Sequence, residues 1–247
     1  MSDVFGSAGR VGYVAPSTCE RLAKDFYQIV PDTLGLLIAT LSISRINQDH
    51  VKRALEQIET AAMQLVDTGA EAVFSAGIPL VIEGGEAYDT ELKDRLEQAT
   101  GRPCATDFGT ALSALRHLEL ENILLVTPFT DVFTEQIAGA LRDSGMNVVG
   151  QAGLGYDRQS QYGLIPNSAP TTAIRRLMAE HEGVQGVYVP CGRIGDVLQI
   201  SAMEEEFGVP VLTANQLMLW WSLGWAGMRP AVNGGGRLLE GLVEKSP

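Results

Sequence analysis

The sequence predicts an α/β fold made of two similar lobes, each containing a parallel sheet. Short apolar runs alternate with amphipathic stretches along almost all of the 247 residues, which is typical of parallel sheets covered by helices. A strand–turn–helix–strand–helix pattern also occurs twice, and no linker-like or low-complexity segment is present. We expect residues 1–118 with 215–247 to form the first lobe and residues 119–214 to form the second.

The expected strands are short and apolar. In chain order they are residues 11–15, 35–42, 72–75, 104–106, 123–127, 148–150, 186–190 and 211–213. The expected helices are residues 49–68, 87–99, 110–118, 131–144, 171–182, 195–207 and 215–225. The stretch 155–170 is rich in Gly, Ser, Asn and Pro, and it predicts a loop that is a candidate lid.

The internal repeat suggests where a ligand binds. AEAVFSAG (residues 70–77) aligns with QGVYVPCG (residues 185–192), which places Ala76 opposite Cys191 and Thr106 opposite Thr213. Ligands of open α/β sheets bind at the carboxyl ends of the strands. Two facing units would bring Ala76 and Cys191 to one cleft. Thr106 and Thr213 either contact the substrate or cap the helices that follow them.

Composition excludes several functional classes. The 30 acidic and 18 basic residues leave a formal net charge of −12, which disfavours nucleic acid and anionic membranes as partners. The longest apolar stretch, residues 34–41, is too short to span a bilayer, and the N-terminus lacks a signal-peptide pattern. Three cysteines suit neither a disulfide framework nor a zinc site, and the histidines show no metal-binding spacing. We expect a cytoplasmic monomer or homo-oligomer.

Cys191 is the main candidate for chemistry. It follows the apolar strand GVYVP and precedes GRIGD, where a helix is expected to begin. A helix N-terminus and nearby backbone N–H groups lower the pKa of a thiol, and Gly192 allows a substrate to approach the backbone. The alternative is a buried structural cysteine, because free cysteine is among the most buried residue types. Cys104, inside an expected strand, is interpreted as core.

Several motifs occur in order along the chain, namely GYVAPST (12–18), AVFSAG, GRPCAT, ILLVTPFTDVFTE (123–135), VYVPCG and FGVPVLTA. Together they resemble the aspartate/glutamate racemase superfamily, on the branch of the maleate isomerases and arylmalonate decarboxylases. The resemblance covers nearly the whole chain. It implies two α/β lobes related by a pseudo-twofold axis and an active site between them. It also implies no metal or organic cofactor, and up to two cysteines on opposite faces of the substrate.

The chain departs from this family pattern at Ala76. Racemases and maleate isomerases carry a cysteine there, and both mechanisms need it as a proton carrier or as a nucleophile. Arylmalonate decarboxylases lack the first cysteine and keep the second, which matches Cys191. The resemblance therefore implies that Cys191 delivers a proton to one face of an enediolate after carbon dioxide leaves.

A second departure concerns the groups that bind the substrate carboxylate. The decarboxylases use hydroxyl side chains at positions that correspond to Gly77, Ile78 and Phe129, none of which has a side-chain donor. Backbone N–H groups near Gly77, Gly192 and Arg193 remain as oxyanion donors. Arg193 either binds a carboxylate through its guanidinium or is a surface arginine at a helix start.

Residues 17–19 follow the first strand and are expected at the same pocket. Cys19 takes the place of a carboxylate-binding asparagine of the isomerases. It is either a second acid or nucleophile or a thiol that fills space. Ser17 and Thr18 are either polar contacts to substrate or ordinary helix caps.

These observations predict a cofactor-independent lyase or isomerase that acts beside a carboxylate of a small organic acid, with Cys191 as proton donor. Decarboxylation of a malonate-like acid is the leading reaction. The alternatives are a cis–trans isomerase similar to maleate isomerase, a two-thiol racemase that uses Cys19, a different reaction such as hydration, and a small-acid binding protein that has lost its chemistry.

Overall fold

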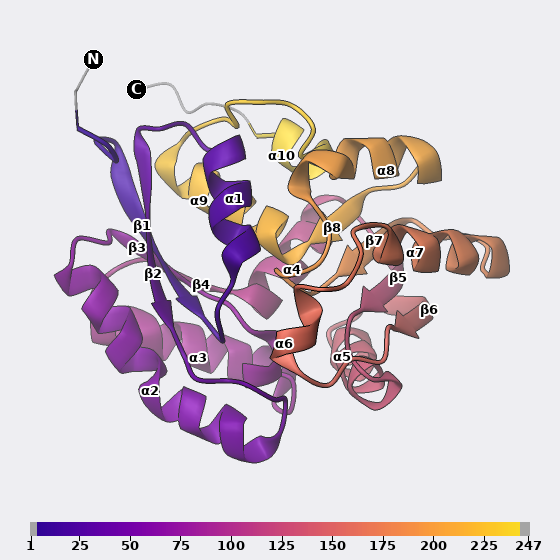
Figure 1. The fold of residues 1–247 in the computed structure, drawn as a ribbon, viewed down its shortest axis with the longest axis horizontal. Helices are drawn as coiled ribbons and strands as arrows, with labels where there is room; N and C mark the ends of the chain where they lie inside the picture. The colour runs from indigo at the N-terminus through magenta and orange to yellow at the C-terminus, as the bar shows by residue number, and fades with distance from the viewer. Residues whose placement is uncertain (1–3, 243–247) are drawn as a thin grey trace.

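The computed structural model describes residues 4–242 and contains two parallel sheets of four strands each. The first sheet has the order β2-β1-β3-β4 and the second the order β6-β5-β7-β8 (Figure 1). The strands of the first sheet are β1 (Gly9–Ala15), β2 (Leu34–Thr40), β3 (Ala72–Ser75) and β4 (Cys104–Thr106). Those of the second are β5 (Asn122–Thr127), β6 (Asn147–Gly153), β7 (Gly186–Val189) and β8 (Val211–Thr213).

Helices follow the strands and cover both sheets, so the predicted α/β class with two similar lobes is confirmed. The α-helices are α1 (Glu20–Ile29), α2 (Gln48–Asp67), α3 (Gly85–Thr100), α4 (Asp107–His117), α5 (Asp131–Asp143), α6 (Gln159–Tyr162), α7 (Ser168–Glu180), α8 (Ile200–Phe207), α9 (Ala214–Ala226) and α10 (Gly236–Glu240). Two short 3₁₀ helices are η1 (Ile78–Leu80) and η2 (Val197–Gln199). None of the helices between residues 4 and 242 has the length and apolar character needed to cross a membrane.

The hydrophobic pattern explains these elements. Every residue of β3 and of β7 is buried, as expected for inner strands of a parallel sheet with both faces covered. Helix α2 buries Ala54, Ile58, Ala62 and Leu65, one residue from each turn, and leaves its other face to solvent. The predicted helix at residues 49–68 is therefore confirmed.

The strand register corrects the predicted alignment of the repeat by one residue. Ser75 pairs with Thr106 in the first sheet, and Val189 pairs with Thr213 in the second. Counted from these pairs, the residue opposite Ala76 is Pro190, and Cys191 comes one position later. A tight turn, in which the Cys191 N–H donates to the Val189 carbonyl at 2.9 Å, takes up the extra residue.

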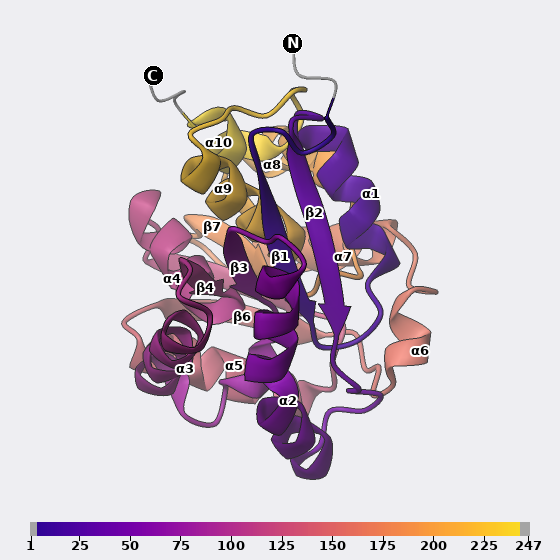
Figure 2. The same cartoon turned by 90° about the vertical axis from the view of Figure 1, so that its left-hand side faces the viewer.

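Helix α9 connects the two lobes. It follows β8 of the second sheet and packs against α1 and α4 of the first lobe (Figure 2). Its buried side includes Leu217, Met218 and Leu223. The first residue of this helix, Ala214, lines the cavity between the lobes. The domain boundaries given above remain a prediction.

Two local predictions were wrong. The helix expected to begin at Gly195 begins at Ile200, after η2, and residues 191–196 form turns. The stretch 155–170 is not a loop throughout, because it contains α6 and the first residues of α7. Pro166 and Pro170 suggested irregular backbone, but Pro170 lies in the first turn of α7, where proline is tolerated.

Candidate active site

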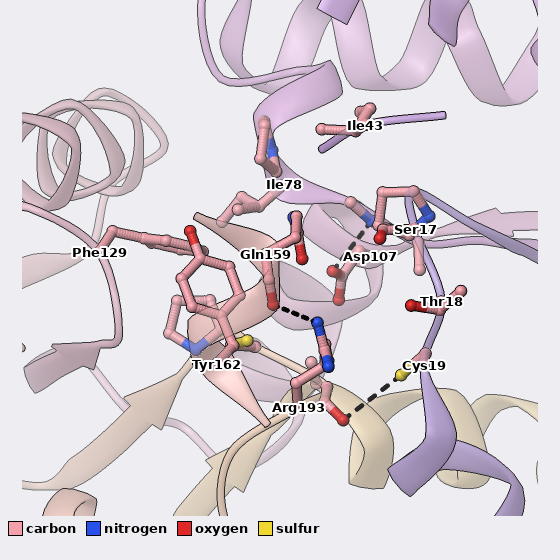
Figure 3. Close-up of a pocket in the computed structure, with 18 of the residues that line it drawn as sticks. Ser17, Thr18, Cys19, Ile43, Ile78, Asp107, Phe129, Gln159, Tyr162 and Arg193 are labelled. Carbon is pink, nitrogen blue, oxygen red and sulfur yellow. Dashed lines mark hydrogen bonds between the residues drawn. The ribbon is translucent and has the colours of Figure 1, made fainter. Parts of the chain in front are cut away.

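A cavity lies between the two lobes and is lined by every residue predicted for the site. These are Ser17, Thr18, Cys19, Ala76, Gly77, Ile78, Phe129, Cys191, Gly192 and Arg193. The structure adds Tyr13, Pro16, Ile43, Pro79, Asp107, Gln159, Tyr162, Pro190 and Ala214 (Figure 3). Most of these residues follow the carboxyl ends of β1, β3, β4, β7 and β8, where a parallel sheet leaves room for ligands.

The environment of Cys191 differs from the prediction. No helix begins at this residue, so it gains no helix N-terminus, and burial raises the pKa of its thiol to about 12. The backbone N–H and the guanidinium of Arg193 act in the opposite direction but do not prevail. The expectation of a lowered pKa was therefore wrong. Near neutral pH the thiol keeps its proton, which suits a proton donor better than a nucleophile.

Cys19 lies beside the turn that carries Cys191. Its Sγ donates to the Gly192 carbonyl at 3.5 Å, and burial raises the pKa of this thiol to about 11. Cys19 precedes the first residue of α1 without capping it through its side chain. The second thiol is therefore next to the Cys191 turn, in contact with the backbone of the second lobe.

The buried side chain of Asn215 also binds the turn that carries Cys191. Asn215 Nδ2 donates to the Gly192 carbonyl at 3.0 Å and to Asp25 Oδ2 at 2.7 Å. A Cβ at Gly192 would lie 2.5 Å from Asn215 Oδ1, so only glycine fits here. Helices α1 and α9, from which Asp25 and Asn215 come, thereby fix the backbone next to the thiol.

Arg193 is not a surface residue. Its side chain is 13% exposed, and its Nη2 pairs with Glu20 Oε1 at 2.9 Å. Its Nη1 donates to the Gln159 carbonyl, whereas Nε is buried and has no hydrogen-bond partner among the described residues. The guanidinium thus joins α1 to α6 and keeps one donor unused at the edge of the cavity.

Helix α6 and its flanks close the cavity from the second lobe. The Gln159 N–H donates to the Ser44 carbonyl at 3.3 Å, and Arg45 and Arg158 form an isolated antiparallel bridge. Tyr162, at the end of α6, is 1% exposed. Residues 158–162, within the segment predicted as a lid, therefore line the cavity through Gln159 and Tyr162 and contact Ser44 and Arg45 of the first lobe.

Tyr162 brings a hydroxyl to a part of the site where the sequence offered none. Its ring packs edge-on against Phe129, with 5.7 Å between the ring centroids. Its hydroxyl is buried without a hydrogen-bond partner in the described chain, and burial raises its pKa. A phenol proton is thus present beside Phe129 but comes from another element.

Asp107 is a site residue that the sequence did not reveal. Its Oδ2 accepts the Gly77 N–H at 3.3 Å, so that N–H is not free as the predicted oxyanion donor. Burial raises the pKa of this carboxyl to about 6. In the sequence it resembles any acidic residue in the first turn of a helix, and only the fold brings it to the Gly77 turn.

Thr106 and Thr213 do not line the cavity. Thr106 Oγ1 accepts the Gly109 N–H, and Thr213 Oγ1 accepts the Gln216 N–H, each at 3.3 Å. Both therefore cap the helices that follow them, α4 and α9. The buried Cys104 is 3% exposed, which confirms its interpretation as core.

Comparison with known proteins assigns the family. The family model of arylmalonate decarboxylase matches residues 11–239. The chain belongs to the arylmalonate decarboxylase family. Its relatives in this group include an arylmalonate decarboxylase of Bordetella bronchiseptica, 23% identical over 90% of this chain and 92% of the relative. A maleate isomerase of Nocardia farcinica is 27% identical over 94% of this chain and 95% of the relative.

Solved structures agree with the arylmalonate decarboxylase family fold. A crystal structure of arylmalonate decarboxylase has a TM-score of 0.82 at 24% identity and covers 94% of this chain and 99% of that chain. A mutant maleate cis–trans isomerase of Nocardia farcinica with a covalently bound succinylcysteine intermediate has a TM-score of 0.85 at 21% identity. That structure covers 94% of this chain and 98% of that one. The two lobes and their arrangement are thus those of the family.

Proposed function

We propose that this chain is a cofactor-independent enzyme that releases carbon dioxide from a malonate-like acid, with Cys191 as the proton donor to carbon. The observation that carries the proposal is the state of the Cys191 thiol. It lines a cavity at the carboxyl ends of the strands, burial raises its pKa to about 12, and Ala76 provides no second thiol.

The reaction balances with these groups alone. The bond between the α-carbon and one carboxylate breaks, carbon dioxide leaves, and the electron pair moves into the remaining carboxylate as an enediolate. The α-carbon then takes the S–H proton of Cys191. The resulting thiolate recovers a proton from solvent, readily so because burial raises its pKa to about 12.

Unused donors support binding of the remaining carboxylate. Tyr162 Oη and Arg193 Nε are buried at the cavity without protein partners in the described chain. Hydrogen-bond donors that face a developing enediolate stabilise it more than they stabilise the substrate. They compensate for the donors absent at Gly77, Ile78 and Phe129.

The two alternative reactions have less support. Cis–trans isomerisation through a covalent cysteine adduct, as in the named relative, requires a thiolate, and Ala76 has none while Cys191 is protonated. A two-thiol racemase requires opposed thiols. Here Cys19 instead contacts Gly192, next to Cys191.

The test measures carbon dioxide release from a panel of mono- and disubstituted malonates, including arylmalonates. We expect turnover by the natural chain and a loss of about a hundredfold or more in Cys191→Ala, the scale of general acid catalysis. Cys104→Ala is the control, because Cys104 lies in the core and does not line the cavity, and it is expected to stay within about threefold of the natural chain. Turnover unchanged in Cys191→Ala, or tight binding of a malonate without any turnover, would contradict the proposal.

A further inference from the structure

Asp107 has a free acceptor atom at the cavity. The residue is 6% exposed and lines the cavity, and Figure 3 shows its carboxylate among the lining side chains, joined to the Gly77 turn. Oδ2 accepts the Gly77 N–H at 3.3 Å. Oδ1 is buried and has no hydrogen-bond partner within residues 4–242. Buried polar atoms are almost always paired, so an unpaired one at a cavity indicates a missing ligand group.

Capping of its own helix does not explain this carboxylate. Asp107 is the first residue of α4, but the cap of that helix is the Thr106 side chain, which accepts the Gly109 N–H. The Asp107 side chain points instead to the turn at Gly77, which follows β3 in the same lobe. The position of the Asp107 carboxylate is therefore fixed by its hydrogen bond to the Gly77 N–H and not by capping of α4.

No cation within residues 4–242 neutralises it either. None of the ion pairs within the described part of the chain includes Asp107, and the guanidinium of Arg193 is held by Glu20 and Gln159. The other titratable groups that interact with Asp107 are Tyr13, Asp89, Tyr188 and Cys191, none of them basic. With its pKa at about 6, the carboxyl is mostly ionised above neutral pH.

An ionised carboxylate constrains an acidic ligand. It repels a second carboxylate placed against it, and it is left unpaired by an apolar substituent. An N–H or O–H group of the ligand would donate a hydrogen bond to the unpaired oxygen of this carboxylate. A site with a buried acceptor selects strongly against analogues that lack the matching donor.

We propose that the substrate carries a hydroxyl or amino group on the carbon next to its carboxylate, and that Asp107 Oδ1 accepts a hydrogen bond from it. This inference rests on the proposed function for the acid itself and adds the chemistry of its substituent. Donors at Tyr162 and Arg193 then bind the carboxylate, and Asp107 binds the substituent.

The test is a set of three matched malonates, namely hydroxymalonate, aminomalonate and methylmalonate. Their dissociation constants are measured by calorimetry at pH 7.5 with Cys191→Ala, in which slow turnover leaves the ligand intact during the titration. We expect the hydroxy or the amino compound to bind at least about tenfold more tightly than the methyl compound. The tighter of the two identifies the donor. Equal or tighter binding of methylmalonate, or no binding of any of the three, would overturn the inference.

Two variants assign the preference to Asp107. Asp107→Asn keeps an oxygen for the Gly77 N–H and turns the free atom into a donor, so the preference is expected to fall below about threefold. Asp89→Asn is the matched control. Asp89 is also buried, with a free Oδ1, but it binds Thr106 at 2.7 Å and does not line this cavity. A preference that survives in Asp107→Asn contradicts the assignment.

The readout separates this inference from the proposed function. Binding is measured in Cys191→Ala and carbon dioxide release in the natural chain, so each result stands without the other. If no malonate released carbon dioxide but the preference held, only the proposed reaction would fail. If turnover occurred with no preference, only the role of Asp107 would fail. Should Asp107→Asn not fold, the three ligands with Cys191→Ala alone still decide.

Discussion

Cys191 is subject to two opposing influences. Burial raises the pKa of its thiol, and the backbone N–H and guanidinium of Arg193 lower it. Burial prevails and the pKa reaches about 12, because the residue lies in a turn rather than at a helix N-terminus. The nucleophilic form of cysteine is the thiolate, so this environment favours proton donation over covalent chemistry.

We therefore predict slow alkylation of Cys191. At pH 8 its reaction with iodoacetamide is expected to be at least about a hundredfold slower than that of a free cysteine, since the thiolate fraction falls tenfold per pKa unit. Timed quenching and peptide mass spectrometry measure the rate, with the urea-unfolded chain as control. Alkylation of the folded chain at the rate of a free thiol would indicate a lowered pKa and a nucleophile.

The turn after β7 depends on its packing against α1 and α9. Gly192 sits against Asn215, which is itself held by Asp25. Substitution of Gly192 by Ala places a methyl group 2.5 Å from Asn215 Oδ1, so the buried amide must shift. The element that positions the thiol is thus sensitive to one methyl group.

Gly192→Ala is expected to lower the free energy of unfolding by about 1–3 kcal/mol, the usual cost of overpacking. Gly139→Ala, in the middle of α5 with nothing within 4 Å of the added carbon, is the control. It is expected to raise the free energy of unfolding by up to about 1 kcal/mol. Urea denaturation measures both. A neutral or stabilising effect of Gly192→Ala would show that the turn is not held as described.

The elements were largely predictable, because their signals are local. Apolar runs located the strands, and periodicity located α2. Helix α1 was missed although Leu22, Phe26 and Ile29 have helical spacing, since Cys19, the residue before it, makes no side-chain cap. The start of α8 was misplaced because Gly195, in the left-handed region at φ +80°, belongs to the preceding turn.

The site was predictable only in part. Residues next to strand ends were found, because the fold class places them at the cavity. Asp107 and Tyr162 were not, since their roles depend on contacts that the sequence does not show, namely that of Asp107 with the Gly77 turn and that of Tyr162 with Phe129. Such contacts between segments distant in sequence leave no periodic signal.

The whole molecule carries several buried carboxyls that affect its stability. Burial raises the pKa of Asp25, Asp89 and Asp107 from 3.8 to about 6. Between pH 4 and 6 the folded chain therefore binds more protons than the unfolded chain, and stability rises as pH falls through this window. The lowered pKa values of exposed acids such as Glu86 and Glu135 act in the opposite direction at lower pH.

We predict a higher free energy of unfolding at pH 5.5 than at pH 7.5, by about 1 kcal/mol for each of the three carboxyls. Relief of the net charge of −12 acts in the same direction. Urea denaturation at the two pH values measures the difference, and Asp89→Asn is expected to reduce it. A lower stability at pH 5.5 would show that these carboxyls are ionised at little cost in the folded state.

The central claim is that one thiol, from the second lobe, delivers the proton to one face of the substrate. Its most direct test is the configuration of the product from a disubstituted malonate, measured by chiral chromatography. The natural chain is expected to give one enantiomer, and Cys191→Ala/Ala76→Cys, with the thiol moved to the first lobe, the opposite enantiomer at a lower rate. A racemic product from the natural chain, or the same enantiomer from both proteins, would contradict the account.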